Sequence, residues 1–144
     1  MPTQPTYDDV NLILKLYDMR REDRMRQARA WFTASFKVKT IDELNAICPP
    51  GSEANASYRM VVTYWEMVAS FITGGVLNQA LFFESGRELL FVWERIRDVV
   101  PDLRRVNKDE AAYRNLELAA SSYIAWWGAR APEAYAAFSA RVRG

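Results

Sequence analysis

Two glutamates in the most apolar part of the chain are the best candidates for acid–base chemistry or metal binding. Glu66 and Glu94 lie in two apolar segments that a Gly-Gly pair and a short aromatic connector separate. If these segments form antiparallel helices that turn near residues 79–80, Glu66 lies opposite Trp93 and Glu94. Two adjacent carboxylates build acid–base pairs and sites for hard cations. The favoured alternative is that each carboxylate pairs with an arginine or faces water.

The other usual catalytic groups are missing. The sequence contains no histidine, which excludes Ser-His-Asp and Cys-His nucleophiles, histidine bases and most transition-metal sites, including the Glu-x-x-His pairs of di-iron bundles. Cys48 is the single cysteine, and it precedes two prolines with no base beside it to activate the thiol. We therefore expect no enzyme, no catalytic residue, no cofactor and no bound metal.

The single thiol and the polar start of the sequence indicate a cytoplasmic protein. An unpaired cysteine fits a reducing compartment, and residues 1–10 lack the basic start and apolar run of a secretory signal. The best candidate for a membrane span, residues 60–77, is short, contains Glu66 and includes Gly74 and Gly75. We therefore expect no membrane span.

An arginine-rich segment from Arg20 to Arg29 is the strongest candidate for binding a polyanion. Five arginines accompany two acids there, whereas the whole chain has a net charge of +1. Such a segment can hold the phosphates of a nucleic acid. Pairs three or four residues apart on a helix, such as Glu22 with Arg26, neutralise much of this charge. Nucleic-acid binding is therefore not expected.

Aromatic residues make up 13% of the chain and include five tryptophans. Aromatic side chains at helical spacing fill cores, and they also concentrate at interfaces between subunits. We therefore favour a non-enzymatic helical interaction module that forms a homo-oligomer, most simply a dimer, and a different protein partner stays open. The alternative is a small-molecule binder with an apolar, aromatic-lined cleft between helices. The candidate ligand or interface residues are Trp65, Glu66, Phe91, Trp93 and Glu94.

Helices must position these residues, because apolar residues recur at helical spacing and no strand pattern occurs. The clearest helix is predicted over residues 53–73, with Ser52 as its cap. One narrow polar stripe runs along it and the remaining surface is apolar, which predicts a central helix packed on several sides. The polar stripe consists of Arg59, Thr63, Glu66, Ser70 and Thr73.

The remaining sequence predicts helices packed around this one. A long helix is expected over residues 7–35, and capping patterns that begin at Thr40, Ser85 and Asn107 predict three further starts. Pro101 is expected to break the chain, and Pro132 suits the first turn of a last helix. The inward stripe of the long helix is predicted to be Val10, Leu14, Tyr17, Met25, Ala28 and Phe32.

The whole chain, residues 1–144, is thus predicted to be a single all-α domain. We expect an irregular bundle of six or seven helices around the central one, with a frayed lead-in at residues 1–5. Its size allows one sizeable core without disulfides or metals.

Two strings in this sequence are similar to a known family. They are LKLYDMRREDRMRQARAWF and YRMVVTYWEMVASFITGGVLNQALFFESGRELLFVWERI, and the most specific portion is R-M-x-x-x-Y-W-E followed by G-x-L/V-x-x-x-L-F-F. They resemble small uncharacterised bacterial helical proteins grouped as a domain of unknown function, over about residues 10–105. The resemblance implies a bacterial source and an α-helical fold, and it supplies no activity, ligand or catalytic residue.

Overall fold

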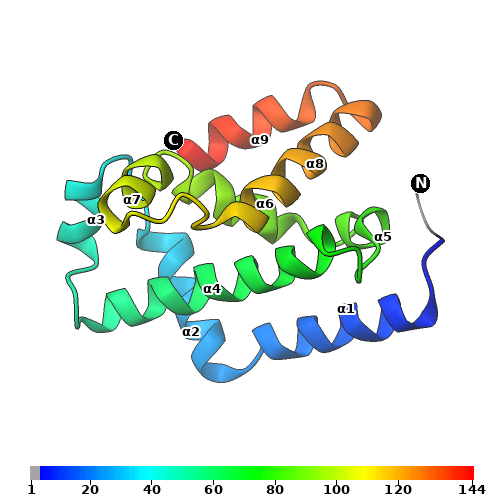
Figure 1. Cartoon of the computed structure of the whole chain (residues 1–144), viewed down its shortest axis with the longest axis horizontal. Helices are drawn as coiled ribbons and strands as arrows, with labels where there is room; N and C mark the ends of the chain where they lie inside the picture. Colours follow the sequence, from blue (N-terminus) through cyan, green and yellow to red (C-terminus); the bar gives the residue numbers. More distant parts are fainter. Residues whose placement is uncertain (1–3) are drawn as a thin grey trace.

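The computed structural model describes residues 4–144 and contains, within them, nine helices and no β-strand (Figure 1). The all-α fold expected from the sequence is therefore confirmed. The helix number exceeds the predicted six or seven because the first predicted helix is divided and an additional helix forms at residues 100–107. Part of the expected lead-in, residues 1–3, lies outside the described residues. The helices are α1 (Tyr7–Arg20), α2 (Asp23–Ser35), α3 (Ile41–Ile47), α4 (Glu53–Thr73), α5 (Gln79–Phe83), α6 (Arg87–Ile96), α7 (Val100–Asn107), α8 (Arg114–Arg130) and α9 (Ala134–Arg143).

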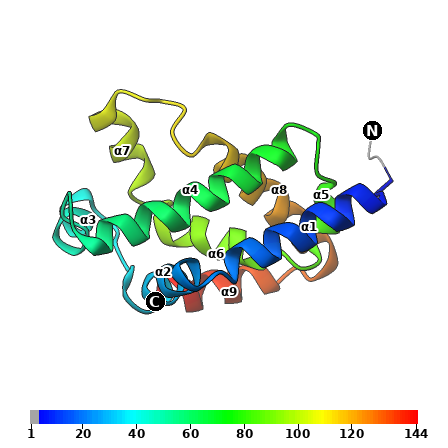
Figure 2. The ribbon, with the colours of Figure 1, turned by 90° about the horizontal axis from the view of Figure 1, so that it is seen from below.

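The central helix is α4, as its nearly continuous apolar surface predicted. Ser52 caps its first turn by accepting a hydrogen bond from the N–H of Asn55. α4 packs most extensively against α2 and α8, and it also packs against α6. Figures 1 and 2 show it running along much of the long axis of the molecule. The core therefore forms around the apolar sides of α4.

The prediction of a single helix over residues 7–35 is wrong, because the chain turns between Arg20 and Asp23 and forms two helices. The Glu22 carboxylate accepts hydrogen bonds from the N–H groups of Arg24 and Met25, and so begins α2. These two backbone hydrogen bonds lower the pKa of Glu22. A carboxylate is stabilised at the positive end of a helix, so this position favours a new start over a continuing helix.

The break divides the predicted inward stripe of this segment into a buried half and an exposed half. α2 keeps its predicted orientation against α4. α1 instead buries Leu16 and leaves the predicted apolar stripe on its outer surface. The buried half is Met25, Ala28 and Phe32, and the exposed half is Val10, Leu14 and Tyr17.

The side-chain cap predicted at Ser85 is absent, although α6 begins within two residues of it. The capping box at Thr40 is present, but α6 begins after Gly86 without a side-chain cap. The capping pattern at Ser85 fails because its glutamate, Glu88, binds Arg29 of α2 instead of the backbone. A contact between helices thus replaces the local contact that the sequence pattern indicated.

The segment after α6 also departs from its prediction. Asn107 ends α7 and does not open the next helix, which begins at Arg114 after Tyr113 in the left-handed conformation, with φ of 59°. Pro101 lies in the first turn of α7, where a missing N–H leaves no hydrogen bond unmade. The last helix, α9, begins at Ala134, just beyond the predicted start, and packs against α6 and α8.

Candidate functional site

Glu66 lies on α4 and caps the start of α8. Its carboxylate accepts hydrogen bonds from the N–H groups of Asn115 and Leu116, at 3.3 and 2.8 Å, and from the side-chain amide of Asn115 at 2.8 Å. The residue before α8, Tyr113, supplies no side-chain cap. Glu66 therefore provides, from another helix, the side-chain cap that the residue before α8 does not supply.

We expect Glu66→Ala to lower the free energy of unfolding by about 1–2 kcal/mol, the usual cost of losing a helix cap. Glu66→Gln keeps one acceptor oxygen and should lose less. Urea unfolding followed by circular dichroism measures both variants. Glu110→Ala, at an exposed loop residue just before α8, serves as the control and should change stability by less than about 0.5 kcal/mol. A Glu66→Ala loss as small as the control's would show that α8 does not depend on this cap.

Glu94 lies on α6 and binds α9 with a completely buried side chain. Its carboxylate accepts hydrogen bonds from the hydroxyls of Tyr135 and Ser139, at 2.7 and 2.6 Å, and a weaker one from Arg97 at 3.5 Å. Burial and the hydrogen bond to Glu94 raise the pKa of Tyr135. Glu94 therefore acts as the polar attachment point of α9.

The two glutamates have different partners, and the acid–base or cation pair considered from the sequence does not form between them. Glu66 binds the start of α8, whereas Glu94 binds α9. In the described part of the chain, no three acidic, cysteine or histidine side chains come together as metal ligands.

Trp93 and Phe91, the aromatic candidates on α6, both take part in packing. Trp93 is buried. The Phe91 ring packs edge-on against Phe32 of α2, with 6.2 Å between ring centroids, and the Arg95 guanidinium lies over its face. The contact point expected at Phe91 is therefore partly covered by α2.

Three of the five arginines between Arg20 and Arg29 contact other helices. Arg29 forms a two-pronged ion pair with Glu88 on α6, at 2.6 and 2.7 Å, and also donates to the carbonyl of Arg20. Arg24 donates to Ser57 on α4 at 3.1 Å. These contacts use the same N–H donors that a bound phosphate would need.

We expect Cys48 to react slowly with Ellman's reagent in the folded protein. The thiol is buried, and burial raises its pKa to about 11. At pH 8 the thiolate fraction is then roughly one in a thousand, against about one in four for an exposed thiol. The reaction rate should increase as the pH approaches 11, and unfolding in urea should make the reaction fast. Fast reaction of the native protein at pH 8 would contradict the burial of this thiol.

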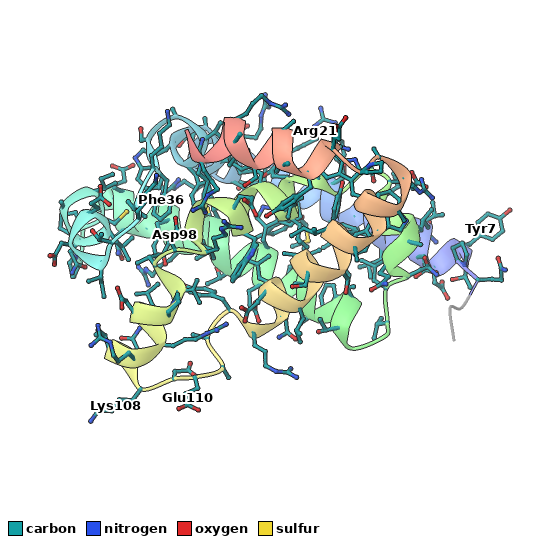
Figure 3. All side chains as sticks on the ribbon, turned by 90° about the horizontal axis from the view of Figure 1, so that it is seen from above. Tyr7, Arg21, Phe36, Asp98, Lys108 and Glu110 are labelled. Carbon is teal, nitrogen blue, oxygen red and sulfur yellow. The ribbon has the colours of Figure 1, made fainter. Side chains whose placement is uncertain are left out.

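α1 has an exposed apolar face, which includes three residues that the sequence assigned to the inward stripe, Val10, Leu14 and Tyr17. Figure 3 shows Tyr7 projecting from the end of α1 away from the rest of the molecule. The helical spacing was visible in the sequence, but spacing alone does not tell which surface covers an apolar stripe. We define the α1 face as the exposed residues Tyr7, Val10, Leu14 and Tyr17. Their exposed fractions are 88, 40, 57 and 45%.

A cleft of about 340 Å³ opens beside the α1 face, between α1, α4 and the connector from α5 to α6. It contains Trp65, as the small-molecule alternative required, but Trp93 is not among its lining residues. The Trp65 side chain is buried, and its indole N–H has no hydrogen-bond acceptor among the described residues. The other lining residues are Ile13, Leu14, Leu16, Tyr17, Arg20, Tyr64, Phe82, Ser85 and Gly86.

The helices of residues 4–144 include none that is both long enough and apolar enough to cross a membrane. Comparison with curated proteins and with solved structures found no match. One family model, described as Domain of unknown function (DUF4760), matches residues 5–123. The match contains the α1 face and the whole cleft, and α9 lies beyond it. The match covers most of the sequence, so the chain belongs to the family described as Domain of unknown function (DUF4760).

Proposed function

We propose that the chain is a non-enzymatic interaction module that forms a homodimer, in which α1 of one copy packs antiparallel against α1 of the other. The exposed α1 face is the observation that carries this proposal. Five of the eight large hydrophobic residues exposed in residues 4–144 belong to α1. Contiguous exposed apolar surface of this kind marks an interaction site.

The spacing of the α1 face suits a second copy of the same helix. Its four residues are separated by three, four and three positions, so the spacing is the same from either end. Two antiparallel copies can therefore place Tyr7 opposite Tyr17 and Val10 opposite Leu14 in one arrangement. Such a twofold interface is self-complementary and closes at a dimer, and the spacing is that of a coiled-coil seam.

The charges of α1 favour the same partner. Exposed Asp8 lies in the first turn, whereas Arg20 and Arg21 lie at the other end. An antiparallel pair brings these opposite ends together and aligns the helix dipoles favourably. Between Tyr7 and Arg21 three acids balance three bases, whereas helices that lie on anionic membranes carry an excess of lysine and arginine. A protein surface therefore fits better than a lipid surface.

The size of the α1 face indicates a weak dimer. A stable protein interface buries about 1,600 Å² in total, and α1, with 14 residues, is only about 21 Å long. We therefore expect a dissociation constant in the micromolar range, on the order of 10–100 µM.

Sedimentation velocity across a concentration series tests the dimer. The wild type should sediment increasingly as a dimer toward roughly 200 µM, and Val10→Lys should remain a monomer because it places two charges in the seam. Val106→Lys is the matched control, since Val106 is also an exposed valine but lies on α7. A wild type that stays monomeric over this range, or a dimer that Val10→Lys leaves intact, contradicts the proposal.

Disulfide trapping tests the orientation. A mixture of Tyr7→Cys and Tyr17→Cys chains, each made in a Cys48→Ala background, should cross-link between the two different variants on mild oxidation. Tyr7→Cys alone should cross-link poorly, because its copies lie at opposite ends of an antiparallel pair. Efficient cross-linking of Tyr7→Cys with itself would instead indicate a parallel arrangement.

A further inference from the structure

We propose that the cleft between α1, α4 and the α5–α6 connector binds a small amphipathic carboxylate, with an apolar body inside the cleft and its carboxylate at Arg20. The cleft shares Leu14 and Tyr17 with the α1 face, but the ligand proposal does not depend on the dimer and is tested below in a monomeric variant. The volume of about 340 Å³ lies at the small end of the range for ligand pockets. It therefore fits a compact molecule and not a long lipid.

The inner wall of the cleft is apolar and fixed in position. Leu16, Trp65 and Phe82 line it and are 4, 2 and 5% exposed. The Phe82 ring lies directly against Gly86, where an added Cβ atom would be 2.2 Å from the Phe82 Cε2 atom. Only glycine at position 86 therefore allows this placement of the Phe82 ring. Such a wall suits the hydrocarbon or aromatic part of a ligand.

Arg20 is the charged group of the cleft, and its charge is incompletely neutralised. Arg20 and Arg29 share one carboxylate, that of Glu88. Arg29 holds both Glu88 oxygens at 2.6 and 2.7 Å, whereas Arg20 reaches one of them at 3.4 Å. Two guanidinium groups with one glutamate leave one excess positive charge. A ligand carboxylate supplies the missing negative charge with the planar geometry that a guanidinium prefers.

Neighbouring side chains hold the Arg20 guanidinium beside the aromatic wall. Its central carbon lies 4.9 Å from the centre of the Tyr17 ring and 5.6 Å from that of Trp65. Its side chain is only 16% exposed, so a charge pair formed there is less screened than one at the surface. Arg20 is thus oriented before a ligand arrives, which lowers the entropic cost of binding.

The indole N–H of Trp65 is a buried polar group in the residue that forms part of this wall. It has no acceptor among residues 4–144, although buried polar groups nearly always have a partner. A single charged lining residue, Arg20, in mostly apolar surroundings favours a monocarboxylate. A phosphate dianion would instead require several basic or backbone N–H donors.

Isothermal titration with 3-phenylpropionate and its uncharged amide tests the site. We expect the carboxylate to bind with a dissociation constant below about 1 mM, and the amide to bind roughly tenfold more weakly. Arg20→Gln should remove this difference between the two probes. Arg21→Gln is the matched control, because Arg21 is exposed and does not line the cleft, and it should preserve the difference.

Nuclear magnetic resonance locates the binding and separates it from self-association. In the Val10→Lys background, the indole N–H signal of Trp65, assigned by its loss in Trp65→Phe, should shift as 3-phenylpropionate is added. Arg20→Gln can be checked for an intact fold in the same spectra. Equal affinity for acid and amide, no shift at Trp65, or a carboxylate preference that survives in Arg20→Gln would each overturn the proposal.

Discussion

Glu94→Ala should lower the free energy of unfolding by about 2–4 kcal/mol, because it removes the shared acceptor of two hydroxyl groups in a buried site. The Glu94 side chain is fully buried, and it accepts hydrogen bonds from Tyr135 and Ser139 of α9. Its third partner, Arg97, is 36% exposed and can turn toward water. The loss therefore comes mainly from the unpaired hydroxyls and the cavity left beneath α9. It is a large share of the 5–15 kcal/mol that stabilises a typical domain.

Guanidinium chloride unfolding measures this loss, and hydrogen exchange locates it. Amides of residues 134–143 should exchange faster in Glu94→Ala, since α9 loses its polar attachment to α6. Glu84→Ala is the matched control: Glu84 also pairs with an arginine, Arg130 at 3.0 Å, but both side chains are more than half exposed. Exposed pairs contribute little, so the control should lose less than about 0.5 kcal/mol. A Glu94→Ala loss as small as that, or unchanged exchange in α9, would contradict the assigned role.

The parts of the fold that the sequence predicted are those decided by neighbours along the chain. The predicted caps at Thr40 and Ser52 are both present, because each side chain accepts a hydrogen bond from an N–H three residues later. α4 was predicted as the central helix because it is apolar on almost all sides, and no arrangement of the other helices changes that property.

The parts that the sequence missed are decided by residues far away in the chain. The start of α8 depends on Glu66, nearly 50 positions earlier, and no local pattern reports that contact. The cap at Ser85 is absent because Arg29 takes the carboxylate of Glu88. The sequence predicts one inward apolar stripe along residues 7–35. Because the chain turns at Glu22, the part of this stripe in α2 is buried and the part in α1 is exposed.

The sequence also predicted some residues of the candidate site and missed others. Trp65 was identified from its place on the central helix, and it does line a cleft. Arg20 was seen only as part of a basic segment, because its position beside Trp65 depends on how α1 crosses α4. The α1 face was identified as apolar, but its exposure requires knowledge of the whole packing.

Arg95→Leu should destabilise the protein by about 3 kcal/mol, because one guanidinium binds the ends of two helices that are far apart in sequence. Arg95 donates to the carbonyls of Phe32, Thr33 and Phe36 at the end of α2, at 3.3, 3.2 and 2.8 Å. It also donates to the carbonyl of Val142 in α9, at 3.0 Å. Its partners are thus the negative ends of helix dipoles, which stabilise a cation. Burial among neutral groups lowers the pKa of Arg95, yet the group stays protonated at any pH that the protein survives.

Arg95→Lys separates the charge from the geometry of this contact. Lysine keeps the positive charge, but its ammonium is a single point that cannot span both helix ends. We therefore expect Arg95→Lys to recover less than half of the loss seen in Arg95→Leu. Arg105→Leu is the control, because Arg105 is 71% exposed and forms an exposed ion pair with Asp102. If Arg95→Lys were as stable as the wild type, charge alone would hold α2 and α9 to α6. If Arg95→Leu matched the control, the carbonyls would be solvated without the arginine, and packing alone would account for the contact of α9 with α6.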